Sequence, residues 1–157
     1  MDKDLFKKTE AILYDYNNLA LRIELLKAEI KDLEESYKGC GSIGYEERTQ
    51  STNKFSSSVE NEIIEREKEL KVLRDDLSKK ITLKRRIDGA VQGLNDEERK
   101  LVELRYINKR SLSWNQIAFV LKYSQEYCRK DLRNKAIISI IDIIFYNPYI
   151  QNKLVLN

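Results

Sequence analysis

A heptad repeat near the start of this 157-residue chain constrains its fold more than any other feature. Two stripes of mostly apolar side chains recur at seven-residue intervals between residues 3 and 37. The stripes are Leu5, Ile12, Leu19, Leu26 and Leu33, and Thr9, Tyr16, Ile23, Ile30 and Tyr37. Such a double stripe is typical of one long helix that packs along another helix. Because a single helix cannot bury its own stripe, the pattern predicts a helical pair.

A second apolar stripe predicts the partner helix. It runs from Val59 to Leu94 and is interrupted by polar residues. The segment 38–57 between the two stripes contains three of the five glycines and a run rich in Ser, Thr and Asn, which are residue types that favour loops. We therefore expect residues 1–94 to form a long helical hairpin, or coiled coil, with a mobile loop at 38–57. The stripes do not distinguish pairing within one chain from pairing between chains.

Composition supports an all-α fold and argues against an enzyme. Proline occurs once and 35% of the residues are charged, a balance that suits long helices. The chain has no histidine, so the commonest general base and the commonest zinc ligand are missing. Cys40 and Cys128 are far apart in the sequence, which argues against a zinc site and against a disulfide framework. A glycine-rich phosphate loop is also absent. We expect no enzymatic activity, no cofactor and no metal.

No stretch of the sequence has the features of a membrane segment. The longest apolar run, 136–146, contains Asp142 and is about half as long as a bilayer-spanning helix. The first residues alternate in charge, unlike a signal peptide. We expect a cytoplasmic protein without membrane contact.

The stretch from residue 101 to 136 has the pattern of a helix-turn-helix. Ser113 and Gln116 form a capping box at the start of a short helix. A turn at residues 122–124 follows, and Ser124 begins a second helix. The residues expected to face inward are Trp114, Ile117, Ala118 and Leu121 on the first helix, and Cys128, Leu132 and Ala136 on the second. Asn95 and Glu98 form another capping pair, which places the start of a second domain, 95–157, at that point.

Polar and cationic side chains gather around the start of the second helix, predicted at 124–136. Helices that enter the major groove use such groups to read base edges and to hold phosphates. The predicted DNA-binding residues are Lys122, Ser124, Gln125, Glu126, Arg129, Lys130 and Arg133. Acidic residues exceed basic ones in residues 1–37, whereas basic residues exceed acidic ones in residues 95–157. The excess of cations thus lies in the half that is predicted to bind double-stranded DNA.

These residues carry a resemblance to a known family. The run EERKLVELRYI (97–107), Ser113 and Trp114, Ile117 and Ala118, Ser124 and residues 129–136 resemble region four of bacterial sigma factors. They are still more similar to the regulators of phage late operons of the ArpU and RinA type. In that family the first residues of the second helix contact promoter bases, which implies this role for Gln125, Glu126, Arg129 and Lys130. The chain has no counterpart of the DNA-melting sigma regions, which argues against a complete sigma factor.

The apolar segment after Ala136 is longer than this motif needs. If it extends the second helix, one face covers the small domain and the other has no partner there. We expect that second face to form a dimer or to contact the hairpin. A dimer would require paired DNA half-sites about one helical turn apart.

The leading hypothesis is a phage or prophage activator of late genes that binds DNA and acts with host RNA polymerase. One alternative is a DNA-packaging subunit similar to the small terminase proteins, for which ring-shaped oligomers would be expected. Another is an inhibitor or appropriator that binds RNA polymerase through the same motif. A second basic cluster at Lys79, Lys80, Lys84, Arg85 and Arg86 is either a solvated helix face or an extension of the phosphate contacts.

Overall fold

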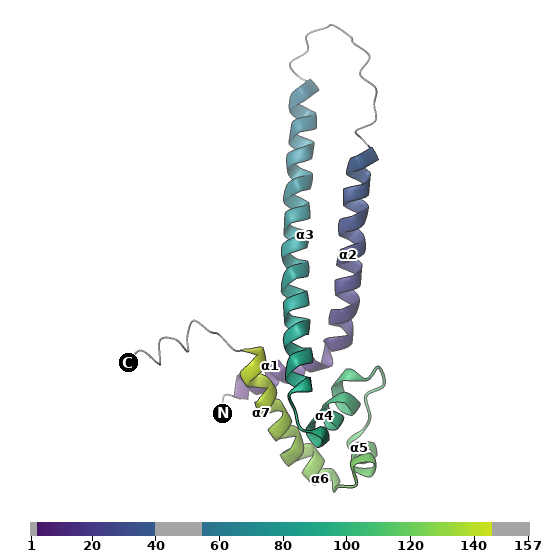
Figure 1. Ribbon diagram of the computed structural model, residues 1–157, viewed down its shortest axis with the longest axis vertical. Coiled ribbons are helices and arrows are strands. Elements are labelled where there is room, and N and C mark those ends of the chain that lie inside the picture. Colours follow the sequence, from purple (N-terminus) through teal and green to yellow (C-terminus); the bar gives the residue numbers. More distant parts are fainter. Residues whose placement is uncertain (1–2, 40–54, 146–157) are drawn as a thin grey trace, which may run out of the picture. The chain divides into compact units, whose positions relative to one another are not determined.

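The computed structural model describes residues 3–39 and 55–145, and every regular element in these ranges is a helix (Figure 1). The predicted all-α fold is confirmed for this part of the chain. The loop expected at 38–57 is shorter at both ends, because α2 (Tyr16–Gly39) and α3 (Phe55–Gln92) extend into it. No glycine or proline at 55–57 prevents helical backbone angles. The remainder of that loop, 40–54, and the segment after residue 145 lie outside the described residues.

The chain divides into two compact units. One combines the N-terminal residues up to Ala20 with the residues from Thr82 onward, and the other is Leu21–Ile81. The first unit therefore joins two segments that are distant in sequence, which the periodicity of the sequence does not indicate. The predicted division into domains 1–94 and 95–157 depends on helix-capping signals and stays a prediction.

The N-terminal stripe does not form one continuous helix, so the expectation of a single helix over residues 3–37 is wrong. The chain turns at Asp15, which separates α1 (Lys3–Tyr14) from α2. Helix α1 buries Phe6, Thr9 and Leu13, whereas Leu5 and Ile12 of the predicted stripe are only half-buried. The reason is that α1 packs against two C-terminal elements, the short π-helix η2 (Glu103–Ile107) and the helix α7 (Arg133–Ile144).

The core of the first unit is built from both of its sequence segments. Helices α4 (Asp96–Val102) and η2 form one helical run, followed by α5 (Trp114–Leu121). A second helical run follows, and it consists of α6 (Gln125–Tyr127), the π-helix η3 (Cys128–Leu132) and α7. The side chains that are almost completely buried include Leu13, Ile87, Leu101, Ile117, Leu132, Ile137 and Ile140. Burial of each such side chain contributes about 1.5–3 kcal/mol. The predicted burial of Cys128, Leu132 and Ala136 is confirmed.

Helix α7 has one buried face and one exposed face. Ala136, Ile137, Ile140 and Ile144 are buried, and α7 contacts α1 and α4. The predicted covering of the small domain by one face of the apolar segment is therefore confirmed, with α1 as an unforeseen neighbour. The side chains of Ile138, Ile143 and Phe145 are each about two-fifths exposed. The expectation that this second face forms a dimer or contacts the hairpin stays a prediction.

The second unit consists of parts of α2 and α3. Ile23 and Ile30, which the heptad pattern predicts to face inward, are buried. Arg74 Nη2 lies 2.6 Å from Glu34 Oε1 and joins the two helices. Because both side chains are well exposed, this ion pair contributes little to stability. None of the helices in the described ranges is long and apolar enough to span a membrane.

Candidate nucleic-acid interface

The start of α5 is fixed by the capping box that the sequence predicts. Ser113 precedes the helix in an extended conformation, and its side chain accepts a hydrogen bond from the backbone N–H of Gln116. In return, the Gln116 side chain accepts from the backbone N–H of Ser113 at 2.9 Å. The two bonds satisfy donors that a helix start otherwise leaves unpaired. The first turn of α5 is thus held in a defined direction.

The end of α5 has a left-handed residue that is not glycine. Lys122 has φ 59° and ψ 37°, and the backbone N–H of Tyr123 donates to the carbonyl of Ala118 at 3.1 Å. This bond spans six residues and is the one that closes a Schellman motif at a helix end. The turn ends α5 and leads into α6. Lys122 is therefore constrained by the backbone as well as being a candidate phosphate contact.

Replacement of Lys122 by glycine is expected to stabilise the protein by about 0.5–1 kcal/mol, because glycine adopts positive φ without the steric conflict of a Cβ atom. In thermal unfolding this gain corresponds to an increase of a few degrees in Tm. Lys122→Ala is the matched control, since it removes the same charge but keeps the Cβ atom. Equal Tm values for the two variants would contradict the proposed strain.

Ser124 caps the second helical run as predicted. Its hydroxyl accepts a hydrogen bond from the backbone N–H of Tyr127 at 3.1 Å. Ser124 is exposed, and its role in this structure is to fix where α6 begins. From this start, α6, η3 and α7 run without interruption from Gln125 to Ile144.

The predicted reading residues lie together on the exposed side of this run. Gln125, Glu126, Arg129 and Lys130 are all exposed. Lys130 Nζ donates to Glu126 Oε1 at 2.6 Å, and this hydrogen bond, with the charges of Lys130 and Arg129, lowers the pKa of the Glu126 carboxyl. Within the described ranges, Gln125 and Arg129 have no side-chain hydrogen bond or ion pair. Their side chains are free to contact a partner without losing an interaction.

Arg133 differs from the other predicted DNA-binding residues because it packs against α1. Its Nε lies 3.3 Å from Glu10 Oε1. The two groups form an ion pair, but the N–H of Nε does not form a hydrogen bond to this oxygen. The guanidinium also lies 5.2 Å from the centre of the Phe6 ring. Glu10 accepts a second contact, a 2.6 Å hydrogen bond from the hydroxyl of Tyr106. Burial and this hydrogen bond both raise the pKa of Tyr106, so its hydroxyl remains a donor.

A stack of aromatic and cationic side chains holds the loop before α5, and no local pattern in the sequence indicates it. The guanidinium of Arg105 lies 4.9 Å from the ring centre of Trp114 and 5.6 Å from that of Tyr14. It also donates to the carbonyl of Leu112 at 2.8 Å. Trp114 is half-buried beneath this cation and does not reach the middle of the core. Tyr14 belongs to α1, so this helix helps to position α5.

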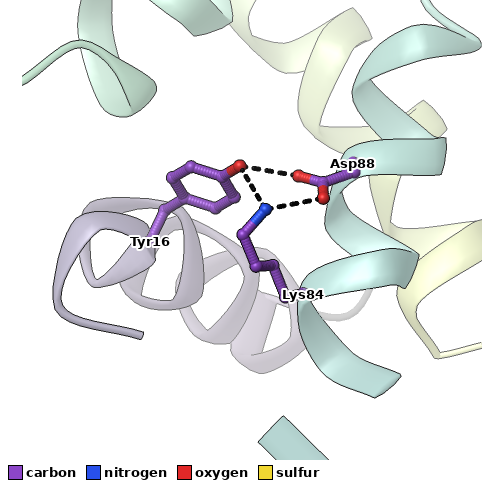
Figure 2. A network of polar contacts seen from close by, with 3 residues as sticks. All are labelled: Tyr16, Lys84 and Asp88. Atoms are coloured by element: carbon purple, nitrogen blue, oxygen red, sulfur yellow. Dashed lines mark hydrogen bonds and ion pairs between the residues drawn. The ribbon is translucent and has the colours of Figure 1, made fainter. Parts of the chain in front are cut away.

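Most of the second basic cluster makes contacts within the protein. Lys84 Nζ donates to Asp88 at 2.8 Å and to the hydroxyl of Tyr16 at 3.0 Å, contacts that are drawn in Figure 2. The Tyr16 hydroxyl donates to Asp88 at 2.7 Å. The hydrogen bond to Asp88, followed by that to Tyr16, raises the pKa of Lys84. In the same unit, Arg86 donates to the carbonyl of Ile144 at 3.1 Å.

Lys80, in the second unit, pairs with Asp76 at 2.7 Å. Three of the five cations in the cluster therefore have partners within the protein. These contacts weaken the reading of the cluster as an extension of the phosphate-binding surface.

Helix α5 also exposes an apolar side chain that helical periodicity does not single out. The side chain of Phe119 is 86% exposed, and Val120 and Tyr123 beside it are each 40% exposed. The Tyr123 hydroxyl donates to Glu97 at 2.5 Å, which joins the turn to α4. Single exposed apolar residues are common on protein surfaces, but aromatic residues are enriched where proteins bind one another. No group of three or more Cys, Asp or Glu side chains in the described ranges is arranged to hold a metal ion.

Comparison with known proteins gives a family without a known role. Residues 5–140 match the model of a family described as a protein of unknown function (DUF722). No curated protein and no solved structure matches the chain.

Proposed function

We propose that this chain, which belongs to the DUF722 family, is a sequence-specific DNA-binding regulator of transcription. In this proposal α5, the turn at Lys122 and the helical run from Gln125 form a helix-turn-helix. The observation that carries the proposal is the set of exposed polar and cationic side chains at the start of the second helical run. The starts of α5 and of this run are each fixed by a capping serine. Such a helix start is what proteins of this motif place against base edges.

The exposed residues match the chemistry of the major groove. A helix with its side chains is about 10–12 Å across, which fits a groove about 12 Å wide. Arg129 can form two hydrogen bonds to one guanine, and Gln125 can form two to one adenine. Glu126 can accept from the amino group of cytosine, which requires its pair with Lys130 to open. Lys130 is then available to a phosphate, as is Lys122 on the turn.

The resemblance to region four of sigma factors and to phage late-operon regulators suggests how DNA binding would act. The regulator would hold host RNA polymerase at a promoter, with the helical segments of the second unit as a coiled-coil surface for a partner. The exposed apolar side chains of α7 fit a homodimer. A dimer would bind two half-sites about 34–36 Å apart, or a multiple of that distance.

The test is a titration with DNA from upstream of the operons that neighbour the gene, at several salt concentrations. The wild type is expected to bind one site selectively, and Arg129→Ala/Lys130→Ala is expected to weaken that binding by about 5- to 150-fold, the equivalent of ~1–3 kcal/mol for a lost base contact. Lys68→Ala/Lys71→Ala is the control, since it removes two exposed cations from the second unit. Equal losses of DNA affinity in the two double variants would contradict recognition of bases by the second helical run.

The exposed ring of Phe119 favours a second function, the capture of RNA polymerase by the same motif without DNA reading. Phenylalanine, like tyrosine and tryptophan, is enriched at protein interfaces relative to the rest of the surface. The same titration separates the two functions. Wild-type binding no tighter than ~10⁻⁴–10⁻⁶ M for every sequence, which is the non-specific range, would favour capture of the polymerase.

A further inference from the structure

A shallow groove of about 280 Å³ lies between α1 and the beginning of α7, both in the first unit. Its lining residues are Lys3, Phe6, Lys7, Glu10, Arg133 and Asn134. Three of these residues are cations and one is an anion, so the formal charge of the lining is 3 − 1 = +2. Most of the accessible lining is apolar, and the ammonium, guanidinium and amide groups of the lining residues are the donors that the groove offers to an anion.

The one carboxylate in the groove has partners of its own. Glu10 accepts the hydrogen bond from Tyr106 and pairs with Arg133, and its side chain is only 21% exposed. This arrangement holds the Arg133 guanidinium at the border of the groove and offsets the negative charge of Glu10. Lys3 and Lys7 are exposed and four residues apart, so they lie on the same face of α1. Within the described ranges neither lysine has an ion pair or a side-chain hydrogen bond.

We propose that this groove holds a phosphate group of the DNA backbone, next to the base pairs read by the start of the second helical run. The inference rests on the proposed function. Arg129 lies in the π-helix η3 and Arg133 begins α7, so the two residues are four positions apart on one continuous helical run. A duplex in contact with Arg129 therefore passes within about one helical turn of the groove. Ammonium, guanidinium and amide groups are the usual donors to phosphate oxygens.

This assignment gives α1 a direct part in binding. Helix α1 is remote in sequence from the helix-turn-helix, yet it supplies two of the three cations in the groove. Contacts to phosphates set the register and orientation of a protein on the duplex but carry no sequence information. The groove would thus strengthen binding to every DNA sequence by the same factor, while Gln125 and Arg129 select among sequences.

The experiment compares Lys7→Gln with Lys8→Gln in the full chain. Both lysines are exposed neighbours on α1 and both changes remove one charge, but only Lys7 lines the groove. Binding to the selected duplex and to an unrelated duplex is measured over a range of salt concentrations. For Lys7→Gln, the slope of log K against log salt is expected to become shallower by about 0.9, the value for one phosphate contact, with the same loss of affinity for both duplexes. The double variant Lys3→Gln/Lys7→Gln is expected to bind both duplexes more weakly still, with little further change in slope, because both lysines face the same phosphate.

The outcomes separate this inference from the proposed function. Selective binding by the wild type together with equal slopes for Lys7→Gln and Lys8→Gln would overturn the phosphate groove and leave the proposed function intact. A wild type without selective binding would overturn both. Thermal melts accompany each titration, and unchanged Tm values are expected because both lysines are exposed. A change in selectivity in Lys7→Gln, without a change in slope, would also count against a phosphate contact.

Discussion

A fragment of residues 95–157 is expected to be mostly unfolded in far-ultraviolet circular dichroism and to melt without a cooperative transition, whereas the full chain melts cooperatively. The fragment lacks α1 and the end of α3, which contribute Phe6, Leu13, Ile87 and Val91 to the buried core. Each such side chain accounts for about 1.5–3 kcal/mol of burial energy. Their combined loss is comparable to the whole stability of a small domain, ~5–15 kcal/mol.

The matched control keeps the first unit and removes the second. In this variant residues 1–20 are joined to 82–157 by a flexible Gly/Ser linker of about fifteen residues, whose average span is roughly 22 Å. Cooperative melting is expected, because both segments of the first unit are present. If residues 95–157 alone melted cooperatively with the helical content of the intact unit, the boundary near residue 94 would be correct and α1 would be dispensable.

Ile140→Ala is expected to lower the free energy of unfolding by about 2–5 kcal/mol, the range for loss of a buried aliphatic side chain with a cavity left behind. Ile140 is 0% exposed. Ile138→Ala is the control on the same helix, because Ile138 is 43% exposed and the two changes alter helix propensity equally. The difference between the variants in chemical denaturation therefore isolates the effect of burial. If the two variants lost equal amounts of unfolding free energy, α7 would not pack in the described orientation.

The control also reports on self-association. If a second copy of the chain covers Ile138, the stability of the wild type will increase with protein concentration and Ile138→Ala will reduce that increase. The effect of Ile140→Ala will not depend on concentration in this way, because its partners lie within the first unit. The same two melts, repeated at two protein concentrations, thus address both faces of α7.

Local signals in the sequence predicted the local structure well. The caps at Asn95, Ser113 and Ser124 depend on residues three positions apart, and the structure contains all three. The inward positions of the second helical run follow from helical periodicity alone. The exposure of Gln125 and Arg129 follows from the same periodicity, because the buried residues occupy the opposite side of the helix.

Long-range contacts could not be predicted in the same way. On α1 two apolar pairs, Leu5 with Ile12 and Phe6 with Leu13, have the same seven-residue spacing, and only the tertiary neighbours decide which pair is buried. The contact between Glu10 and Arg133 joins residues at opposite ends of the chain, and neither residue carries a local signal of it. The sequence therefore predicted the exposure of Gln125 and Arg129 but assigned Arg133 to the solvent. It also overlooked the part of α1 in positioning α5.

The two-segment construction of the first unit has a consequence for synthesis. Phe6 and Leu13 leave the ribosome early, but the elements that cover them, η2 and α7, are made only after residue 102. The apolar face of α1 must therefore remain uncovered, or held by a chaperone, while most of the chain is translated. A product that stops before α7 cannot close this core, so an incomplete copy is open to proteases. Only chains translated through α7 would then escape this degradation.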